Sequence, residues 1–257
     1  MEITFYKYQG TGNDFVMIDD RSESFDASDL KLVSKLCDRK FGIGADGLIL
    51  IRNREGYDFE MIYFNADGTQ SMCGNGARCA VAFSAFIGIV GEKTNFLAID
   101  GPHEAVINKG LVHLLMGEVE GIEKKADDFF VDTGSPHHIR LVENVANYPV
   151  FDEGKSIRYN DSYLPAGTNV NFIEPIAADE IFVRTYERGV ENETLSCGTG
   201  VTAAALVFGK DLKAAEIKIN TLGGKLSVKF TSKAYGGFTD IWLIGPAQQV
   251  FSGKINI

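Results

Sequence analysis

The chain has 257 residues, 45% of them hydrophobic and 23% charged, and a net charge of −10. These proportions are typical of a globular protein and exclude a disordered or fibrous chain. The acidic excess, without a cluster of Lys and Arg, argues against nucleic-acid binding. Neither a signal-peptide pattern nor a run of about 18 apolar residues occurs, which argues against export and membrane insertion. We therefore expect a cytoplasmic protein.

The first part of the chain predicts a hairpin followed by a helix and two strands. Residues 1–20 form two candidate strands joined by a glycine-rich turn at 10–14. Asp26 or Ser28 is expected to cap a helix over residues 30–37. Further strands are expected over residues 48–51 and 57–64, and the second of these ends at the turn 65–68.

Two Cys-Gly-x-Gly turns, at Cys73 and Cys197, are each followed by an Ala-rich apolar segment. Residues 77–90 and 201–208 are apolar on nearly every side, which predicts two buried helices, the second ending at Gly209. A thiol at a helix N-terminus has a lowered pKa, because backbone N–H groups and the helix dipole stabilise the thiolate. The repeated turn therefore indicates two thiols suited to acid–base chemistry.

The other two cysteines, Cys37 and Cys79, lie within candidate helices and are interpreted as buried and inert. Four cysteines in a chain of this length do not form a disulfide framework, and no ligand spacing typical of a metal site is present. We expect no metal. The turns also lack a complete phosphate-binding glycine motif, which argues against a nucleotide.

The two halves of the chain keep the same spacing of parts, which indicates an internal duplication. Asn13 precedes Cys73 by 60 residues, and Ser135 precedes Cys197 by 62. A charged stretch at 117–128 is the expected linker. The predicted division is one half at 1–116, with a returning segment at 246–257, and the other at 117–245. Halves related by a pseudo-twofold axis would place both thiols at an interdomain cleft.

Two thiols on opposite sides of a carbon can invert its configuration, one removing a proton and the other delivering one. His137 and Glu187 are candidates to activate the thiols, although a solvated turn and a surface ion pair are the alternative interpretations. Asn13, Asn75 and Asn169 are among the asparagines in or beside turns, where they favour positive φ or bind polar groups of a ligand.

These motifs resemble the diaminopimelate epimerase family over essentially the whole chain. The most specific segments are 10–15, 65–68 with 73–79, and 187–189 with 197–200. The resemblance implies an α/β (α+β) fold of two similar pseudo-twofold-related domains, each a mixed sheet wrapped around a central helix, with the last strand returning to the first domain. It also implies a cofactor-independent epimerase that interconverts LL- and meso-diaminopimelate in the biosynthesis of lysine and peptidoglycan precursors.

The resemblance further assigns residues to roles. Cys73 and Cys197 would be the acid–base thiols, and His137 and Glu187 would tune them. The substrate would be contacted by Asn13, Asn65, Gly74, Asn75, Asn169, Glu187, Arg188, Gly198 and Thr199. The implied partner is a small amino-acid substrate, with no nucleic acid and no membrane, and the chain is compatible with a homodimer.

Two positions depart from the family pattern, and two other functions stay open. Gly47 stands where many members carry Gln, and Ser135 stands where they carry Asn. A proline or hydroxyproline racemase-type enzyme would share the fold and the paired thiols but would bind a smaller substrate with one carboxylate. A non-enzymatic switch would instead link Cys73 and Cys197 in a disulfide on oxidation.

Overall fold

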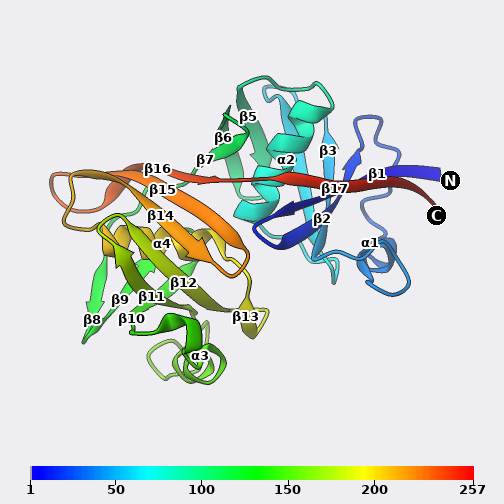
Figure 1. Cartoon of the computed structure of the whole chain (residues 1–257). Helices are drawn as coiled ribbons and strands as arrows, with labels where there is room; N and C mark the ends of the chain where they lie inside the picture. Colours follow the sequence, from blue (N-terminus) through cyan, green and yellow to red (C-terminus); the bar gives the residue numbers. More distant parts are fainter. Residues whose placement is uncertain (1) are drawn as a thin grey trace. The chain divides into compact units, whose positions relative to one another are not determined.

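A computed structural model describes residues 2–257 (Figure 1) and divides into two compact units. The first unit comprises Met1–Leu114 and Gly245–Ile257, and the second comprises Leu115–Ile244. The sequence analysis placed the two boundaries after residues 116 and 245, whereas the units of the structure divide after Leu114 and Ile244. Within residues 2–257, no helix is both long and apolar enough to cross a membrane.

The first unit is a mixed sheet with helix α2 packed against several of its strands. The sheet runs in the order β17-β1-β2-β3-β4-β5-β6-β7, with parallel pairs β2–β3 and β4–β5 and antiparallel pairs elsewhere. The elements are β1 (Glu2–Gly10), β2 (Asn13–Asp19), α1 (Leu30–Cys37), β3 (Gly47–Arg52), β4 (Phe59–Asn65), α2 (Gly74–Phe86), β5 (Lys93–Ala98), β6 (Gly101–Asn108), β7 (Leu111–Leu115) and β17 (Gln248–Asn256).

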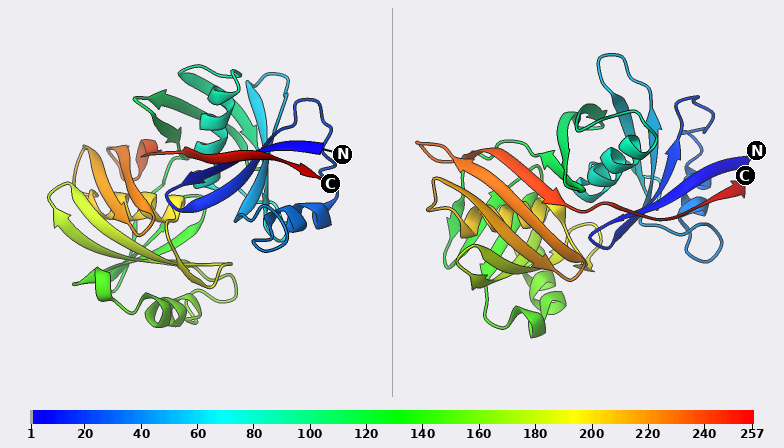
Figure 2. Two further views of the ribbon diagram at one scale, coloured as in Figure 1. Left: turned by 45° about the vertical axis from the view of Figure 1, so that its right-hand side comes forward. Right: turned by 45° about the horizontal axis from the view of Figure 1, so that its top comes forward.

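The C-terminal strand returns to the first unit, where β17 pairs with β1 from Glu2↔Asn256 to Gln9↔Gln248. The two termini therefore lie side by side in both views of Figure 2. On one face of the sheet, Val16, Leu48 and Leu50 pack with α1 residues such as Val33. Phe15, Ile49 and Met61 face the other way, toward Gly76 of α2.

The second unit repeats this order of elements. β9 and β10 form a hairpin, β10–β11 and β12–β14 are parallel pairs, and β11–β12, β14–β15 and β15–β16 are antiparallel pairs. Its elements are β8 (Glu123–Lys125), β9 (Asp128–Asp132), β10 (Pro136–Leu141), η1 (Val145–Asn147), α3 (Val150–Arg158), β11 (Asn169–Ala177), β12 (Glu180–Glu187), β13 (Asn192–Thr194), α4 (Gly198–Phe208), β14 (Ala214–Thr221), β15 (Gly224–Ser232) and β16 (Phe238–Gly245).

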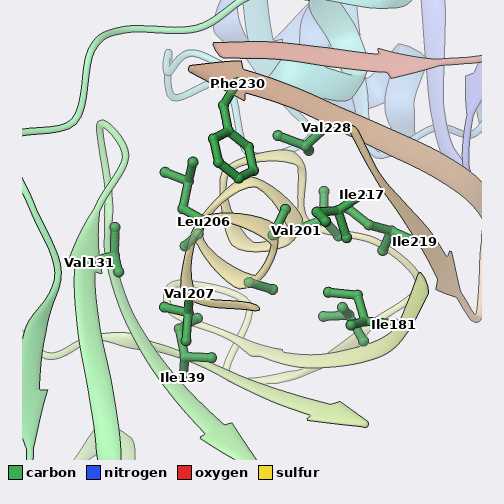
Figure 3. Close-up of a cluster of buried hydrophobic side chains, with 14 of the residues drawn as sticks. Val131, Ile139, Ile181, Val201, Leu206, Val207, Ile217, Ile219, Val228 and Phe230 are labelled. Carbon is green, nitrogen blue, oxygen red and sulfur yellow. The ribbon is translucent and has the colours of Figure 1, made fainter. Parts of the chain in front are cut away.

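The same sequence of pairings in the two units supports the internal duplication. A short helix, α1 or α3, joins the first parallel pair of strands, and the apolar helix, α2 or α4, joins the second pair. Figure 3 shows α4 enclosed by side chains from the surrounding strands, among them Val131, Ile181 and Phe230. The prediction of a mixed sheet around a central helix in each half is confirmed.

Several boundaries differ from the sequence-based prediction. Asp29, rather than Asp26 or Ser28, caps α1, since its carboxylate accepts the N–H of Leu32. The predicted linker at 117–128 contains a short strand, since Glu123–Lys125 forms β8 and pairs with β9. Charged residues can form this strand because the side chains of β8 are exposed or only partly buried.

Candidate active site

Cys73 and Cys197 occupy equivalent places, each as the N-cap of the buried helix of its unit. Both residues are extended, with φ/ψ of −135°/114° and −114°/115°, and the glycine that follows each begins the helix. The N–H of Gly76 donates to the Cys73 sulfur at 3.4 Å. The unpaired N–H groups of a first helical turn favour a negative charge, so both positions favour a thiolate. The two helices begin at the first glycine, three residues earlier than predicted.

In the first unit, Cys73 contacts Asn13, the first residue of β2, which directly follows the turn between β1 and β2. The thiol donates to Asn13 Oδ1 at 3.4 Å, and the Asn75 amide donates to the same oxygen at 3.5 Å. The Asn13 amide nitrogen donates to Asp46 at 2.5 Å, which fixes the orientation of the amide and turns its oxygen toward the thiol. Asp46 is a positioning residue that the sequence analysis did not identify.

Asp46 is itself held by a cluster of charged side chains. Arg39 donates to Asp46 and to both carboxylate oxygens of Asp14, and Lys7 pairs with Asp14. Burial opposes ionisation of Asp14, but hydrogen bonds from Arg39 and Lys7 prevail and lower its pKa to about 2. Asp14 therefore stays ionised, and its ion pairs brace the start of β2, which carries Asn13.

Asn65, at the end of β4, is held by its own turn. The Tyr63 hydroxyl donates to Asn65 Oδ1 at 2.8 Å, and the Asn65 amide donates to Thr69 and Ser71. The ring of Tyr63 also explains the family departure at Gly47. A Cβ at Gly47 would lie 2.4 Å from a Tyr63 ring carbon and 2.4 Å from the Phe64 carbonyl oxygen. The space that a longer side chain would need is filled.

We expect Gly47→Ala to lower the free energy of unfolding by about 1–3 kcal/mol, the usual cost of overpacking. The clash with the Phe64 carbonyl involves backbone and cannot be relieved by a rotamer change. Urea unfolding followed by circular dichroism would measure the effect. Gly91→Ala is the matched control, because a Cβ at Gly91 meets no atom within 4 Å. Equal stability of the two variants would contradict the prediction.

In the second unit, a chain of hydrogen bonds runs from Asn171 through His137 and Thr199 to Cys197. The Asn171 amide donates to the His138 carbonyl, and its oxygen accepts the Thr185 hydroxyl, so its NH₂ faces His137 Nδ1 at 3.1 Å. The imidazole proton is therefore on Nε2, which donates to the Thr199 hydroxyl at 2.9 Å. That hydroxyl lies 3.5 Å from the Cys197 sulfur.

His137 and His138 do not form the solvated turn that was one interpretation of the sequence. Both lie near the start of β10, after Pro136, and are buried. Burial, assisted by the nearby Arg188 charge, lowers the pKa of His137 to about 3. A neutral His137 can orient Thr199, whose hydroxyl can then donate to a Cys197 thiolate. Asn171 is likewise buried, within β11, and the sequence analysis did not identify its role.

The low pKa of His137 makes a prediction about acid stability. Unfolded His137 takes up a proton near pH 6.5, whereas the folded residue stays neutral to about pH 3. The folded protein is therefore destabilised relative to the unfolded chain as the pH falls from 6.5 toward 3. The free energy of unfolding decreases by up to about 1.4 kcal/mol per pH unit in this range. We expect the difference in unfolding free energy between wild type and His137→Gln to be constant above pH 7 and to shrink below pH 6. A difference independent of pH would contradict this.

The remaining predicted residues of the second unit form two groups. Asn169 donates to Ser135 at 3.0 Å and accepts the backbone N–H of Arg188 at 2.9 Å, and the Arg188 guanidinium reaches Ser135 at 3.5 Å. Ser135, the second family departure, is thus part of the network that holds Asn169 and Arg188. Glu187, at the end of β12, accepts the hydroxyl of Thr194 at 2.8 Å.

Cys37 and Cys79 are buried, as predicted, and burial raises the pKa of each thiol to about 12. They stay protonated and have no access to a ligand. Within residues 2–257, no group of three or more His, Cys, Asp or Glu side chains is arranged to hold a metal ion.

The sequence matches a known family and its named members along most of its length. The family model described as diaminopimelate epimerase matches residues 5–120 and 129–248. A protein from Flavobacterium psychrophilum named diaminopimelate epimerase is 50% identical over 254 residues, covering 97% of this chain and 99% of that protein. One of the same name from Aquifex aeolicus is 40% identical over 275 residues, covering 98% and 97%.

Solved structures show the same fold at low sequence identity. A phenazine biosynthesis protein of the PhzF family from Bacillus anthracis has a TM-score of 0.80 at 14% identity and full coverage of both chains. A hydroxyproline epimerase from Agrobacterium vitis has a TM-score of 0.69 at 12% identity, covering 99% of this chain and 92% of that one. The full-length match to the family model and the identity to its named members show that this chain belongs to the diaminopimelate epimerase family.

Proposed function

We propose that this chain interconverts LL- and meso-diaminopimelate, with Cys73 and Cys197 as the two acid–base groups. The observation that carries the proposal is the equivalent placement of both thiols, each at the N-terminus of the buried helix of its unit. Family membership supports the substrate and the place of the reaction in lysine biosynthesis. We also assign the enzyme to the cytoplasm, where this small-molecule substrate would be available.

The reaction requires that both thiols reach the same α-carbon of the substrate. One thiolate takes the α-proton, so that an S–H bond forms as the C–H bond breaks and the electron pair remains on carbon. The opposite thiol then gives its proton to the other face, and its sulfur becomes the new thiolate. The configuration inverts and the protein ends with one thiolate and one thiol, as it began. The two sulfurs supply both proton-transfer groups, so the scheme needs no cofactor.

We propose that the polar residues around the thiols bind the substrate. In the first unit these are Asn13, Asn65, Gly74 and Asn75, and in the second they are Asn169, Glu187, Arg188, Gly198 and Thr199. Support comes from the contacts of Asn13 and Asn75 beside Cys73 and from the network that links Asn169 to Arg188. Backbone N–H groups at the two helix N-termini are suited to a carboxylate. His137 and Glu187 are proposed to tune the thiols.

The test is incorporation of solvent deuterium at the α-carbon, followed by NMR in D₂O under reducing conditions with no cofactor added. LL-diaminopimelate, L-proline and trans-4-hydroxy-L-proline are offered separately. Exchange with diaminopimelate alone is the expected result. Exchange with proline or hydroxyproline alone would reassign the chain to the racemase alternative. Exchange with none of the three would leave the thiol switch as the better account.

A further inference from the structure

The carboxylate of Glu191, in the turn between β12 and β13, is held by four neighbouring residues. Its Oε1 accepts the backbone N–H of Gly189 at 3.0 Å and two donors of the Arg158 guanidinium, Nη2 at 3.0 Å and Nε at 3.3 Å. Its Oε2 accepts the hydroxyls of Tyr159 at 3.0 Å and Tyr186 at 3.4 Å. One carboxylate thus accepts five hydrogen bonds, whereas an ordinary surface ion pair is a single weak contact.

Arg158, the last residue of α3, is fixed by its surroundings. Its side chain is 11% exposed, and its guanidinium carbon lies 4.9 Å from the centre of the Tyr159 ring. The guanidinium also fills the space beside Gly167, where a Cβ would lie 1.2 Å from Nη1. Gly167 has a φ of 69° and brings the chain close to Arg158 just before β11 begins. Arg158 therefore joins the segment that leads into β11 to the turn that follows β12.

The two segments that Arg158 joins carry residues proposed to bind the substrate. Asn169 is the first residue of β11, and Arg188 lies in the turn after β12. The backbone N–H of Arg188 donates to Asn169 Oδ1 at 2.9 Å, and its guanidinium donates to the Ala166 carbonyl at 3.4 Å. The place of Arg188 therefore depends on how both segments are held.

The backbone of Glu191 needs support from these side-chain contacts. Its φ of 55° lies in the left-handed region that side chains other than glycine rarely adopt. Its N–H donates to the Glu187 carbonyl at 2.9 Å, which closes the turn around Arg188. Glu187 is also held by the strand ladder, where it pairs with Asn192. Loss of the Glu191 contacts should therefore displace Arg188 more than Glu187.

We propose that Arg158 and Glu191 are positioning residues that set the place of Arg188 and, through it, the affinity of the enzyme for its substrate. This inference rests on the proposed substrate-binding role of Arg188. It adds one residue of α3 and one of the turn after β12 to those on which substrate binding depends. A guanidinium that binds a substrate carboxylate does so before and during the reaction, so its displacement changes KM rather than kcat.

The first test compares the steady-state kinetics of diaminopimelate epimerisation in variants of this pair. Glu191→Ala removes all five hydrogen bonds and should raise KM about tenfold, with kcat within about threefold of the wild type. Glu191→Gln keeps an oxygen that accepts from Gly189 and Arg158, so its KM should stay within about threefold of the wild type. Arg158→Met should also raise KM, and adding it to Glu191→Ala should raise KM no further, since the pair acts as a unit.

Glu153→Ala is the matched control. Glu153 is also a residue of α3 that forms an ion pair, with Arg140 at 3.4 Å, and its loss should leave KM unchanged. An unchanged KM in Glu191→Ala would overturn the inference, as would a loss of kcat alone. An equal rise of KM in Glu153→Ala would overturn it too, because the effect would then be a general one on α3. If Glu191→Ala does not fold, the KM of Arg158→Met decides in the same way.

The second test measures hydrogen–deuterium exchange of the substrate-free protein by peptide mass spectrometry. The backbone N–H groups of Arg188, Gly189 and Glu191 are all hydrogen-bonded, so they should exchange slowly in the wild type. Glu191→Ala should speed exchange in this turn at least about tenfold and leave α4 unchanged. Unchanged exchange in the turn would overturn the inference. Because exchange requires no turnover, failure here is distinct from failure of the proposed epimerase activity.

Discussion

Cys73→Ala and Cys197→Ala are each expected to lower kcat/KM for diaminopimelate epimerisation by at least about 10³-fold. Loss of a positioned proton-transfer group typically costs 10²- to 10⁴-fold, and here each thiol serves as base in one direction and as acid in the other. Neither unit offers a second ionisable thiol, because burial keeps Cys37 and Cys79 protonated. Epimerisation would be followed by chiral chromatography of the diaminopimelate isomers.

Cys37→Ala is the control for these two variants. Cys37 is buried at the end of α1, so its replacement should cost some stability and leave kcat/KM within about twofold of the wild type. If either Cys73→Ala or Cys197→Ala retained full activity, the two-thiol mechanism would be wrong. The thiol-switch alternative makes a different prediction, namely that the wild type itself shows no turnover under reducing conditions.

Local patterns in the sequence were sufficient to predict the elements that position the thiols. Glycine after each cysteine, followed by an apolar segment, predicted two buried helices, and the spacing of equivalent turns predicted the duplication. These features depend on residues close together in the chain, where turn chemistry and periodicity are informative. The start of each helix was misplaced because glycine was interpreted as part of the turn rather than as the first helical residue.

The contacts that tune the site depend on strand register and could not be predicted in this way. Asn171 reaches His137 because β10 and β11 are parallel neighbours, with His137 opposite Asn169. Asp46 reaches Asn13 through a similar pairing, in which β2 and β3 run parallel.

Gly200→Ala is expected to be strongly destabilising, although alanine is the better helix former. Gly200 lies in the first turn of α4, and a Cβ there would be 2.3 Å from Asn171 Oδ1. The helix-propensity gain of up to about 1 kcal/mol would be outweighed, because displacing the buried Asn171 amide breaks its bonds to His137, His138 and Thr185. Unsatisfied buried polar groups cost about 1–3 kcal/mol each, so we expect a loss of about 2–4 kcal/mol in unfolding free energy.

The equivalent glycine of the first unit is the matched control. A Cβ at Gly76 would meet only the ends of the Ile49, Met61 and Phe15 side chains, at 3.2–3.4 Å, so Gly76→Ala should cost less than about 1 kcal/mol. Urea unfolding of both variants, with the double variant Gly200→Ala/Asn171→Ala, would check the mechanism. Removing the Asn171 amide should abolish the clash, so the double variant should be less destabilised than the sum of the single variants. Additive effects would show that the cost of Gly200→Ala comes from something other than a clash with Asn171.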